Sequence, residues 1–587
     1  MPLTALAGTL GRKRAAHLLR RATFGATKAQ INQVAALTAS EAMDLLFIMN
    51  DLIEPDLPID PATGLEWITA PTTDANSTDR DLTSFFKFWH FGQLLALGVS
   101  EDQALSYATK EKITFLLHTI FTTIASKVAN SKSIYYQNAL FRKFSFDDNG
   151  DPEFNFKTLS KKICVENAML HYLDGDTNVL GSPNENFGRE YLELFSIGRG
   201  LEGSLSELPA PGDYFNYTEQ DVQSAALVFS GFNVDKTFSN VDEDTGLPRG
   251  VTRGKTTASS HDNSTKQFSY RFNNATIEPN PDLLQGSSPT AESALDEIDQ
   301  LVEMVYGVSD EAAKNICRKI YRFYVYHNID QALDESIINN LAQTFINSGF
   351  KLQPVLVDLF QSEHFYESGA GAENDNFGGI IKSPLDLVLG TLKGLQVEIP
   401  DYRTDLDNYY IFMENISQSM NAQGMVYYEP SEVAGYPAYH QFPTFNRSWI
   451  STNYLAERYQ FIQQLVANRE PDEPEDVRVG VDVVQFVKDN FSSVAADAND
   501  LIIELCRYLL PMNDNLTFDA ATDDSSEITA ERLNHFLMAF LYTPQIDADP
   551  EGSWSFRWTN LEDSEVVESQ LKNLFNALLQ SPEYQLS

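Results

Sequence analysis

Apolar residues recur at three- and four-residue spacing along most of the 587-residue chain, which is the pattern of helices that bury one face. Two capping-box patterns, Thr27 with Gln30 and Thr38 with Glu41, predict helix starts in the first part of the chain. The clearest periodic segments are 110–128, 291–308, 311–329, 335–349, 501–511, 530–542 and 568–585. This pattern predicts a mainly α-helical protein.

Two stretches break the helical pattern. Residues 231–280 are rich in Ser, Thr, Asn and Gly and contain short alternating pieces such as KQFSYRF, which predict a small β-hairpin. Residues 468–480, NREPDEPEDVRVG, combine prolines and acids and predict an exposed loop. We therefore expect one large multi-helix unit, made of an N-terminal helical part (1–230), an irregular β-containing excursion (231–290) and a helical part that continues the same unit (291–587).

Composition and charge narrow the classes of protein. The chain is 43% hydrophobic and 12% aromatic, enough for a sizeable core, and its formal net charge of −41 makes nucleic acid and anionic membrane poor partners. It has no run of about 18 apolar residues, so we expect no transmembrane segment. The three cysteines, Cys164, Cys317 and Cys506, lie inside apolar helical patterns and are expected to be buried and unpaired.

One short span, LDGDTNVLGSPNENFGREYLELF, concentrates oxygen donors between two helical segments. From Asp174 onward it follows the spacing of a calcium-binding loop, which places oxygen ligands at the first, third, fifth and twelfth positions and a backbone carbonyl at the seventh. The spacing predicts calcium, or another divalent cation, as a cofactor. The expected ligands are Asp174, Asp176, Asn178, the carbonyl of Leu180, and Glu185.

The same loop also departs from the calcium pattern. Val179 stands where the sharp turn requires glycine, and Pro183 stiffens the end of the window. The alternative is a connection built of Asx turns, in which Asp174 and Asn178 cap backbone amides. Both interpretations are open at the level of sequence.

The helix after the loop places two carboxylates near its apolar face. Glu190 falls inside the edge of the apolar arc and Glu193 just outside it. A carboxylate directed at a core must be paired, bound to metal or protonated, and the candidate partners are Arg20, Arg21 and Arg142. Glu190 and Glu193 are candidate catalytic residues, with a buried Arg–Glu pair as the alternative.

Histidines supply the other catalytic candidates. His118 lies in the very apolar segment FLLHTIF, where a core histidine is the alternative to a catalytic one. His261 and Asp262 are neighbours in the irregular excursion and form a candidate acid/base or ligand pair. The chain has no Gly-rich phosphate loop, GxSxG, HExxH or dinucleotide fingerprint.

Several segments together resemble one family. AAHLLRRATFGAT, the oxygen-rich span and YTEQDVQSAALVFSGF are similar to the uncharacterised bacterial family called domain of unknown function 1800 (DUF1800), and KEKITFLLHTIF, IIKSPLDLVLG, YEPSEVAGYP and LLQSPEYQ follow in the expected order. The resemblance covers almost the whole chain and implies one long helical unit. It also implies an extracytoplasmic location, although the sequence given shows no signal peptide, which leaves a cytoplasmic location open.

Two classes of function are open from these observations. The first is a divalent-cation-dependent hydrolase of an extracellular polymer or polysaccharide, which would use Glu190 and Glu193 with His118 or the His261–Asp262 pair. The second is a non-catalytic, calcium-stabilised helical scaffold, or a surface protein that binds or assembles with a polysaccharide or protein partner. The segments 427–450 and 378–387 are candidates to line a groove, because clustered aromatic residues suit stacking against carbohydrate.

Overall fold

The structure is a computed structural model of the whole chain. It describes residues 3–48, 52–146, 151–205, 207–254, 256–366, 379–469, 477–511, 515–522, 528–543, 549–560 and 562–587. Of the loop predicted at 468–480, residues 470–476 lie outside this described part.

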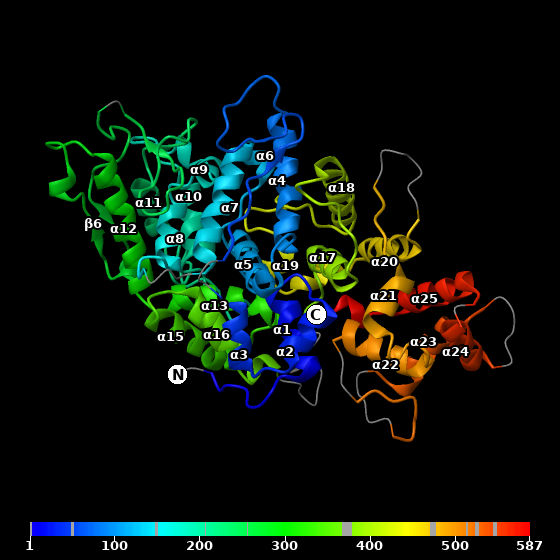
Figure 1. Ribbon diagram of the computed structural model, residues 1–587. Coiled ribbons are helices and arrows are strands. Elements are labelled where there is room, and N and C mark those ends of the chain that lie inside the picture. The colour runs from blue at the N-terminus through cyan, green and yellow to red at the C-terminus, as the bar shows by residue number, and fades with distance from the viewer. Residues whose placement is uncertain are drawn as a thin grey trace.

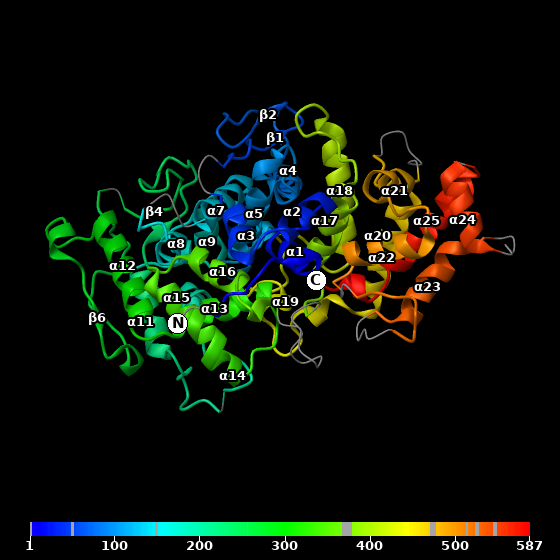
Figure 2. The same cartoon turned by 60° about the horizontal axis from the view of Figure 1, so that its bottom comes forward.

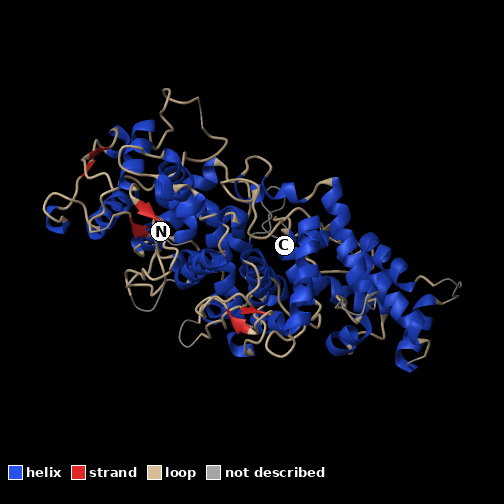
Figure 3. Ribbon diagram, turned by 90° about the horizontal axis from the view of Figure 1, so that it is seen from above, coloured by secondary structure: helices blue, strands red, loops and turns tan. Residues whose placement is uncertain are grey.

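Helices dominate the described residues, as the periodicity predicts (Figure 3). The α-helices of the first half are α1 (Gly11–Ala22), α2 (Lys28–Ala35), α3 (Ala39–Leu46), α4 (Asp79–Leu94), α5 (Glu101–Ile120), α6 (Ala125–Val128), α7 (Ser131–Ser145), α8 (Phe156–Ile163), α9 (Asn167–Tyr172), α10 (Glu185–Glu190), α11 (Glu219–Val228) and α12 (Ala291–Gly307). Those of the second half are α13 (Glu311–Tyr324), α14 (Gln331–Leu333), α15 (Asn339–Asn347), α16 (Leu352–Phe360), α17 (Pro384–Gly394), α18 (Leu406–Ala422), α19 (Pro437–His440), α20 (Thr452–Ala467), α21 (Val483–Phe491), α22 (Ala498–Leu509), α23 (Ala530–Leu541), α24 (Pro550–Asn560) and α25 (Ser564–Leu579).

Short helical turns and strands complete the description. The 3-10 and π turns are η1 (Gly175–Thr177), η2 (Tyr191–Phe195), η3 (Tyr270–Phe272), η4 (Pro281–Leu283), η5 (Asp334–Ile338), η6 (His364–Tyr366), η7 (Phe445–Trp449) and η8 (Glu583–Gln585). The strands are β1 (Ile59–Asp60), β2 (Leu65–Glu66), β3 (Phe232–Asn233), β4 (Val251–Thr252), β5 (Lys266–Gln267) and β6 (Thr276–Ile277).

Each strand belongs to a two-stranded antiparallel pair, and two pairs lie in the predicted excursion. In the first of these, β3 pairs with β4 and Phe232 faces Thr252. In the second, β5 pairs with β6 and Lys266 faces Ile277, so the KQFSYRF segment does open a hairpin. The third pair, β1 with β2, lies far earlier in the chain. A mainly α-helical fold with small β-hairpins is therefore confirmed.

The molecule is elongated, with the first three helices near its middle. In Figures 1 and 2, α1 to α3 lie centrally, α8 to α12 form one end, and α20 to α25 form the other. The last residue lies beside α1 and α2, where Arg21 donates a hydrogen bond to the Ser587 carbonyl oxygen.

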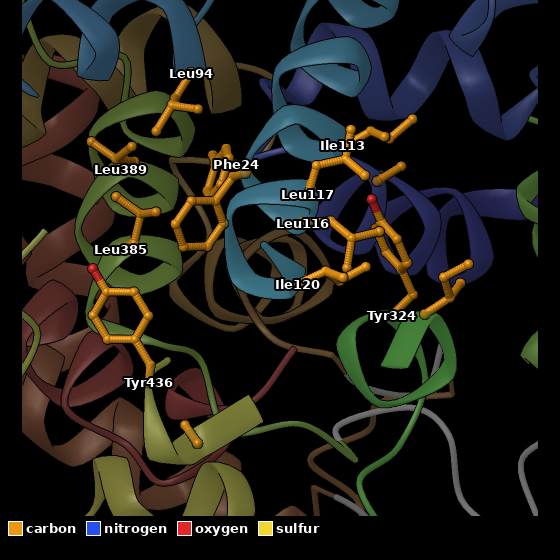
Figure 4. Close-up of a cluster of buried hydrophobic side chains, with 14 of the residues drawn as sticks. Phe24, Leu94, Ile113, Leu116, Leu117, Ile120, Tyr324, Leu385, Leu389 and Tyr436 are labelled. Carbon is orange, nitrogen blue, oxygen red and sulfur yellow. The ribbon is translucent and has the colours of Figure 1, made fainter. Parts of the chain in front are cut away.

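A single large cluster of buried apolar residues runs from Leu10 to Tyr584, with α5 near its centre. Figure 4 shows Leu116 and Leu117 of α5 among side chains from other helices, with Phe24 between α5 and α17. The two predicted capping boxes form, and the three cysteines are buried and free, as expected.

Candidate functional site

The structure contains the acidic helix that the sequence predicts after the oxygen-rich loop. The helix ends in a turn that is wider than an α-helical turn. Asn184 caps α10, because its side-chain oxygen accepts a hydrogen bond from the Asn186 amide at 3.0 Å. After Glu190 the chain enters η2, which is a π-helical turn. Such turns are rare and occur often at functional sites.

Side chains of α13 hold this turn. Asn315 donates from Nδ2 to the Ser196 carbonyl at 2.8 Å, and Lys319 donates from Nζ to the Leu194 carbonyl at 2.7 Å. Gly198 has a φ of +65°, and a Cβ at this position would lie 2.9 Å from the Asn315 side chain. Glycine is therefore required both by the backbone conformation and by the close approach of α13.

The π-helical turn, α13 and α19 surround a pocket of about 220 Å³, which we call the Glu193 pocket. Phe323 and Tyr439 contribute aromatic surface to it. Its charged and titratable side chains are Glu193, Arg199, Glu202, Lys319, Arg322 and His440.

Both carboxylates of the pocket are bound by arginine. Glu193 accepts hydrogen bonds at the same oxygen, Oε2, from the Tyr217 hydroxyl and from Arg199, each at 2.7 Å. Glu202 accepts two hydrogen bonds from Arg322. Burial opposes ionisation of Glu202, but the charge of Arg322 and the hydrogen bonds to the carboxylate together outweigh burial and lower the pKa of this carboxyl below its ordinary value. The other oxygen of Glu193, Oε1, accepts no hydrogen bond from the described residues.

Two basic groups of the pocket have lowered pKa values. Burial lowers the pKa of Lys319 to about 8, against the attraction of Glu202. Burial also lowers the pKa of His440, against the attraction of Glu432, whose carboxylate lies 3.7 Å from His440 Nε2. A lysine with a pKa of about 8 inside a pocket is suited to proton transfer.

Glu190 lies beside the pocket rather than in its wall. It is half-buried and makes no hydrogen bond or ion pair with the residues that the structure describes. Burial, followed by the nearby charge of Glu193, raises its pKa to about 7. The structure therefore brings the two predicted carboxylates together in different surroundings, Glu193 bound by cation and hydroxyl and Glu190 without a partner.

The arginines expected to pair with Glu190 have other partners. Arg142 forms two hydrogen bonds with the fully buried Glu111, at 2.6 and 2.8 Å, and Arg20 donates to the Tyr508 carbonyl at 2.6 Å. The expected buried Arg–Glu pair exists, but its carboxylate is Glu111, not Glu190.

His118 is a core residue in this structure. Its ring stacks on Tyr428 with a centroid distance of 3.9 Å, and neither ring nitrogen has a hydrogen-bond partner among the described residues. Burial lowers its pKa to about 3, so the ring is neutral at physiological pH. Although the next residues, Thr119 and Ile120, line the Glu193 pocket, His118 itself does not.

His261 and Asp262 lie apart from the Glu193 pocket. His261 is buried, its Nδ1 lies 2.8 Å from the Ser230 carbonyl, and its Nε2 lies 3.2 Å from Glu297, which also pairs with Lys266. Asp262 accepts hydrogen bonds from the amide and hydroxyl of Ser264. The two neighbours belong to one local network, because the Asp262 amide donates to the Ser230 hydroxyl and Lys266 contacts both the Asp262 carbonyl and Glu297.

The acidic members of the predicted calcium loop have protein partners. The carboxylate of Asp174 lies 3.7 Å from Lys127, that of Asp176 lies 3.2 Å from His171, and that of Glu185 lies 3.5 Å from Arg189. These contacts are partly exposed, so a cation could compete with them only by replacing them.

The remaining predicted ligands behave as a structural turn. Asn178 is fully buried, donates to the Ala226 carbonyl at 2.7 Å and accepts from the Asn184 amide at 3.0 Å. Leu180 is exposed, and its amide donates to the Ser260 carbonyl. Within the described part of the chain, no group of three or more His, Cys, Asp and Glu side chains is placed to hold a metal ion. Asn178 acts as the capping alternative predicts, whereas the Asp174 side chain makes no capping hydrogen bond with the described residues. Calcium binding stays a prediction.

Sequence reasoning missed Lys319 and His440. His440 does lie in the aromatic segment expected to line a groove, and Tyr439 and Ala434 of that segment line the Glu193 pocket with it. Lys319 occupies an ordinary amphipathic helix, and its sequence context contains no signal for a pocket.

The described helices include none that is long and apolar enough to cross a membrane. No curated protein and no solved structure matches the chain. One family model, described as "Protein of unknown function (DUF1800)", matches residues 17–586, nearly the whole chain. The chain therefore belongs to the DUF1800 family.

Proposed function

We propose that the Glu193 pocket and Glu190 form the active site of a hydrolase that cleaves a polysaccharide or a similar hydroxyl-rich polymer. The observation that carries this proposal is the contrast between Glu190, which has a pKa of about 7 and no partner in the described part of the chain, and Glu193, which is bound by Arg199 and Tyr217. Pairs of carboxylates in such unequal surroundings divide the roles of acid and base in sugar hydrolysis.

In the proposed reaction, protonated Glu190 gives its proton to the bridging oxygen of the bond that breaks. The Oε1 atom of Glu193 accepts a proton from the attacking water, while Arg199 and Tyr217 hold the other oxygen. Water supplies the new C–O bond, and the leaving chain departs as an alcohol. Because Glu190 lies beside the pocket and not in it, the substrate must extend past Glu193, as a polymer would.

The pocket also suits a sugar unit in shape and charge. Phe323 and Tyr439 offer aromatic surface for stacking. Three cations, Arg199, Lys319 and Arg322, face two carboxylates, Glu193 and Glu202, so a neutral or acidic sugar is favoured over a basic one.

A divalent cation, with calcium expected, is a separate proposal for the Asp174–Glu185 loop, and no step above depends on it. A cell-surface or extracytoplasmic location is likewise proposed, because it would place the protein with such polymers. The competing proposal is a calcium-stabilised scaffold or binding protein, which is favoured by the burial of His118 and His261 in structural contacts.

The direct test measures new reducing ends from neutral and uronic-acid polysaccharides with the full chain and with Glu190→Gln and Glu193→Gln. We expect each variant to lose at least about 100-fold in rate, since each removes one proton-transfer role. Glu219→Gln is the matched control, because it breaks a partly exposed ion pair with Arg189 outside the pocket and should keep activity.

A second test needs no substrate. The infrared carbonyl band of a protonated carboxyl, present in the wild type at about pH 6 and missing in Glu190→Gln, should disappear on titration with a midpoint near 7. A Glu190 that ionises near its ordinary value would reject the proposed acid. Cleavage that survives in both glutamine variants would reject the site.

A further inference from the structure

The wall of the Glu193 pocket carries more positive than negative charge. Among the described residues that line it, Arg199, Lys319 and Arg322 are the cations, and Glu193 and Glu202 are the carboxylates. The wall is therefore positive by one charge, although the whole chain has a formal net charge of −41. A local excess of the sign that is scarce elsewhere in the molecule indicates a ligand of the opposite sign.

The excess charge resides on Lys319, because the two arginines are occupied. Arg199 and Arg322 each form an ion pair with a carboxylate of the wall. Lys319 donates from Nζ to the Leu194 carbonyl at 2.7 Å and forms no ion pair with the described residues. An ammonium group has three N–H donors, so Lys319 has donors left for a ligand.

The ammonium group of Lys319 is also held in place. Lys319 lies on α13, and its bond to Leu194 ties Nζ to the π-helical turn that carries Glu193. A side chain that is already fixed loses less conformational freedom when a ligand binds. Burial lowers the pKa of Lys319 to about 8, and an anion bound beside it would raise this pKa again.

A second polar group of the pocket has unused hydrogen-bonding capacity. His440 Nε2 is buried and has no hydrogen-bond partner among the described residues, since the Glu432 carboxylate lies 3.7 Å away. Burial lowers the pKa of His440, and the charge of Lys319 lowers it further, so the two side chains act on each other. A neutral imidazole is a suitable partner for a hydroxyl group.

We propose that the sugar unit held in the Glu193 pocket is a uronic acid, whose carboxylate pairs with Lys319 and one of whose hydroxyls bonds to His440. This inference rests on the proposed hydrolase and narrows its substrate to an acidic polysaccharide. Lys319 determines specificity, whereas the proton transfers belong to Glu190 and Glu193. The net charge of the chain repels a polyanion at a distance, but salt screens this repulsion beyond about 8 Å at physiological ionic strength.

The test compares a uronic-acid tetrasaccharide with its own carboxyl-reduced form, which has the same linkage but no charge. Tetramers of galacturonic acid and of mannuronic acid are titrated calorimetrically into the full chain carrying Glu190→Gln, so that the sugar is bound but not cleaved. We expect the acid form of at least one tetramer to bind about tenfold more tightly than its reduced form.

Lys319→Met, added to Glu190→Gln, removes the charge and keeps the length of the side chain. We expect the acid and reduced forms to bind it within about twofold of each other, while Lys319→Arg keeps the preference for the acid form. Lys314→Met is the matched control, because Lys314 lies on the same helix but does not line the pocket, and the preference should be unchanged.

A pH profile gives a second measurement if Lys319→Met does not fold. The preference for the acid form should be constant below about pH 8 and decrease above it, as the ammonium group of Lys319 loses its proton. Glu202 and Arg322 also act on Lys319, but a carboxyl with a lowered pKa and a guanidinium keep their charges in this range.

The assignment is overturned if the acid and reduced forms bind equally well, or if folded Lys319→Met keeps the preference. In that case cleavage of neutral polysaccharides by the wild type would leave the hydrolase intact without the uronate site. Binding of the acid form without any cleavage by the wild type would support the uronate site and reject the hydrolase. Neither binding nor cleavage of any of these sugars would reject both.

Discussion

Around the Glu193 pocket each carboxylate of the wall faces an arginine, Glu193 with Arg199 and Glu202 with Arg322. Around Asp386, by contrast, one carboxylate pairs with the buried Lys112, and its charge also acts on Arg21, Lys382 and Arg458, which are buried as well. The first arrangement holds charged groups in place at an accessible surface and leaves one acid, Glu190, unpaired among the described residues. The second places several cations in the interior around one aspartate, so that loss of this aspartate would leave buried charge without its counterion.

The largest effect that would test this comparison is expected from Asp386→Asn. It removes the carboxylate from Lys112 and from the other cations on which its charge acts, and breaking a buried pair in this way costs about 3–5 kcal/mol. Denaturant unfolding measures the loss. Asp56→Asn is the control, because its pair with Arg403 is more than half exposed and should contribute no more than about 1 kcal/mol. Equal losses in the two variants would show that Asp386 does not balance the buried cations around it.

The next effect concerns the shape of the Glu193 pocket. Gly198→Ala should destabilise the protein by about 2 kcal/mol, because alanine is strained at a φ of +65° and its Cβ would press on Asn315. Gly181→Ala separates the two causes, since Gly181 has a φ of +81° but no neighbour within 4 Å of the added Cβ. If both variants lose the same stability in thermal or denaturant unfolding, the close approach of α13 contributes nothing.

A smaller effect links Glu190 to pH. Its pKa is raised from 4.5 to about 7 in the folded protein, so between these values the folded state holds a proton that the unfolded state has released. Stability from this group is complete below the lower value and is lost as pH rises through about 7.

Glu190→Gln should therefore gain about 1 kcal/mol over the wild type near pH 8, after allowance for the partial exposure of Glu190, and gain nothing near pH 4. Unfolding curves at the two pH values measure the difference. A gain that does not depend on pH would mean that the substitution acts through packing rather than through the charge of Glu190.

Local patterns predicted the helices, the hairpin at KQFSYRF, the capping boxes and the burial of the cysteines, because neighbours in sequence determine these features. The closeness of Glu190 to Glu193 was predictable for the same reason. The partners of Glu193 were not, since Tyr217 and Arg199 reach it from the connection after the π-helical turn, and the turn itself changes the direction in which side chains point.

The cations around Asp386 show the same limit more strongly. Arg21, Lys112 and Arg458 lie in α1, α5 and α20, whose own patterns are those of ordinary helices, and Lys382 lies two residues before α17. Four of the segments that carry the family resemblance contribute residues here, but only their packing places Arg21, Lys112, Lys382 and Tyr584 together. The spacing of residues within one segment does not show which charged residues of distant segments will lie together.

The smallest expected effect concerns calcium at the Asp174–Glu185 loop. There, carboxylates would be neutralised by a bound metal ion and not by basic side chains. Binding must displace the contacts of Asp174, Asp176 and Glu185, while Asn178 already uses both ends of its amide. A site with a Kd near 1 mM would add only about 0.4 kcal/mol at an equal calcium concentration.

Elemental analysis and thermal unfolding in calcium and in chelator measure this effect. We expect a small gain in Tm with calcium that disappears in Asp176→Ala. In Asp44→Ala, the control on α3, the gain should be kept. A large shift with one tightly held calcium would mean that the loop rearranges around the ion, and an identical small shift in both variants would mean that calcium acts on the acidic surface as a whole. Because a rearranged loop would also move α10, calcium should in that case change the pH midpoint of Glu190 as well.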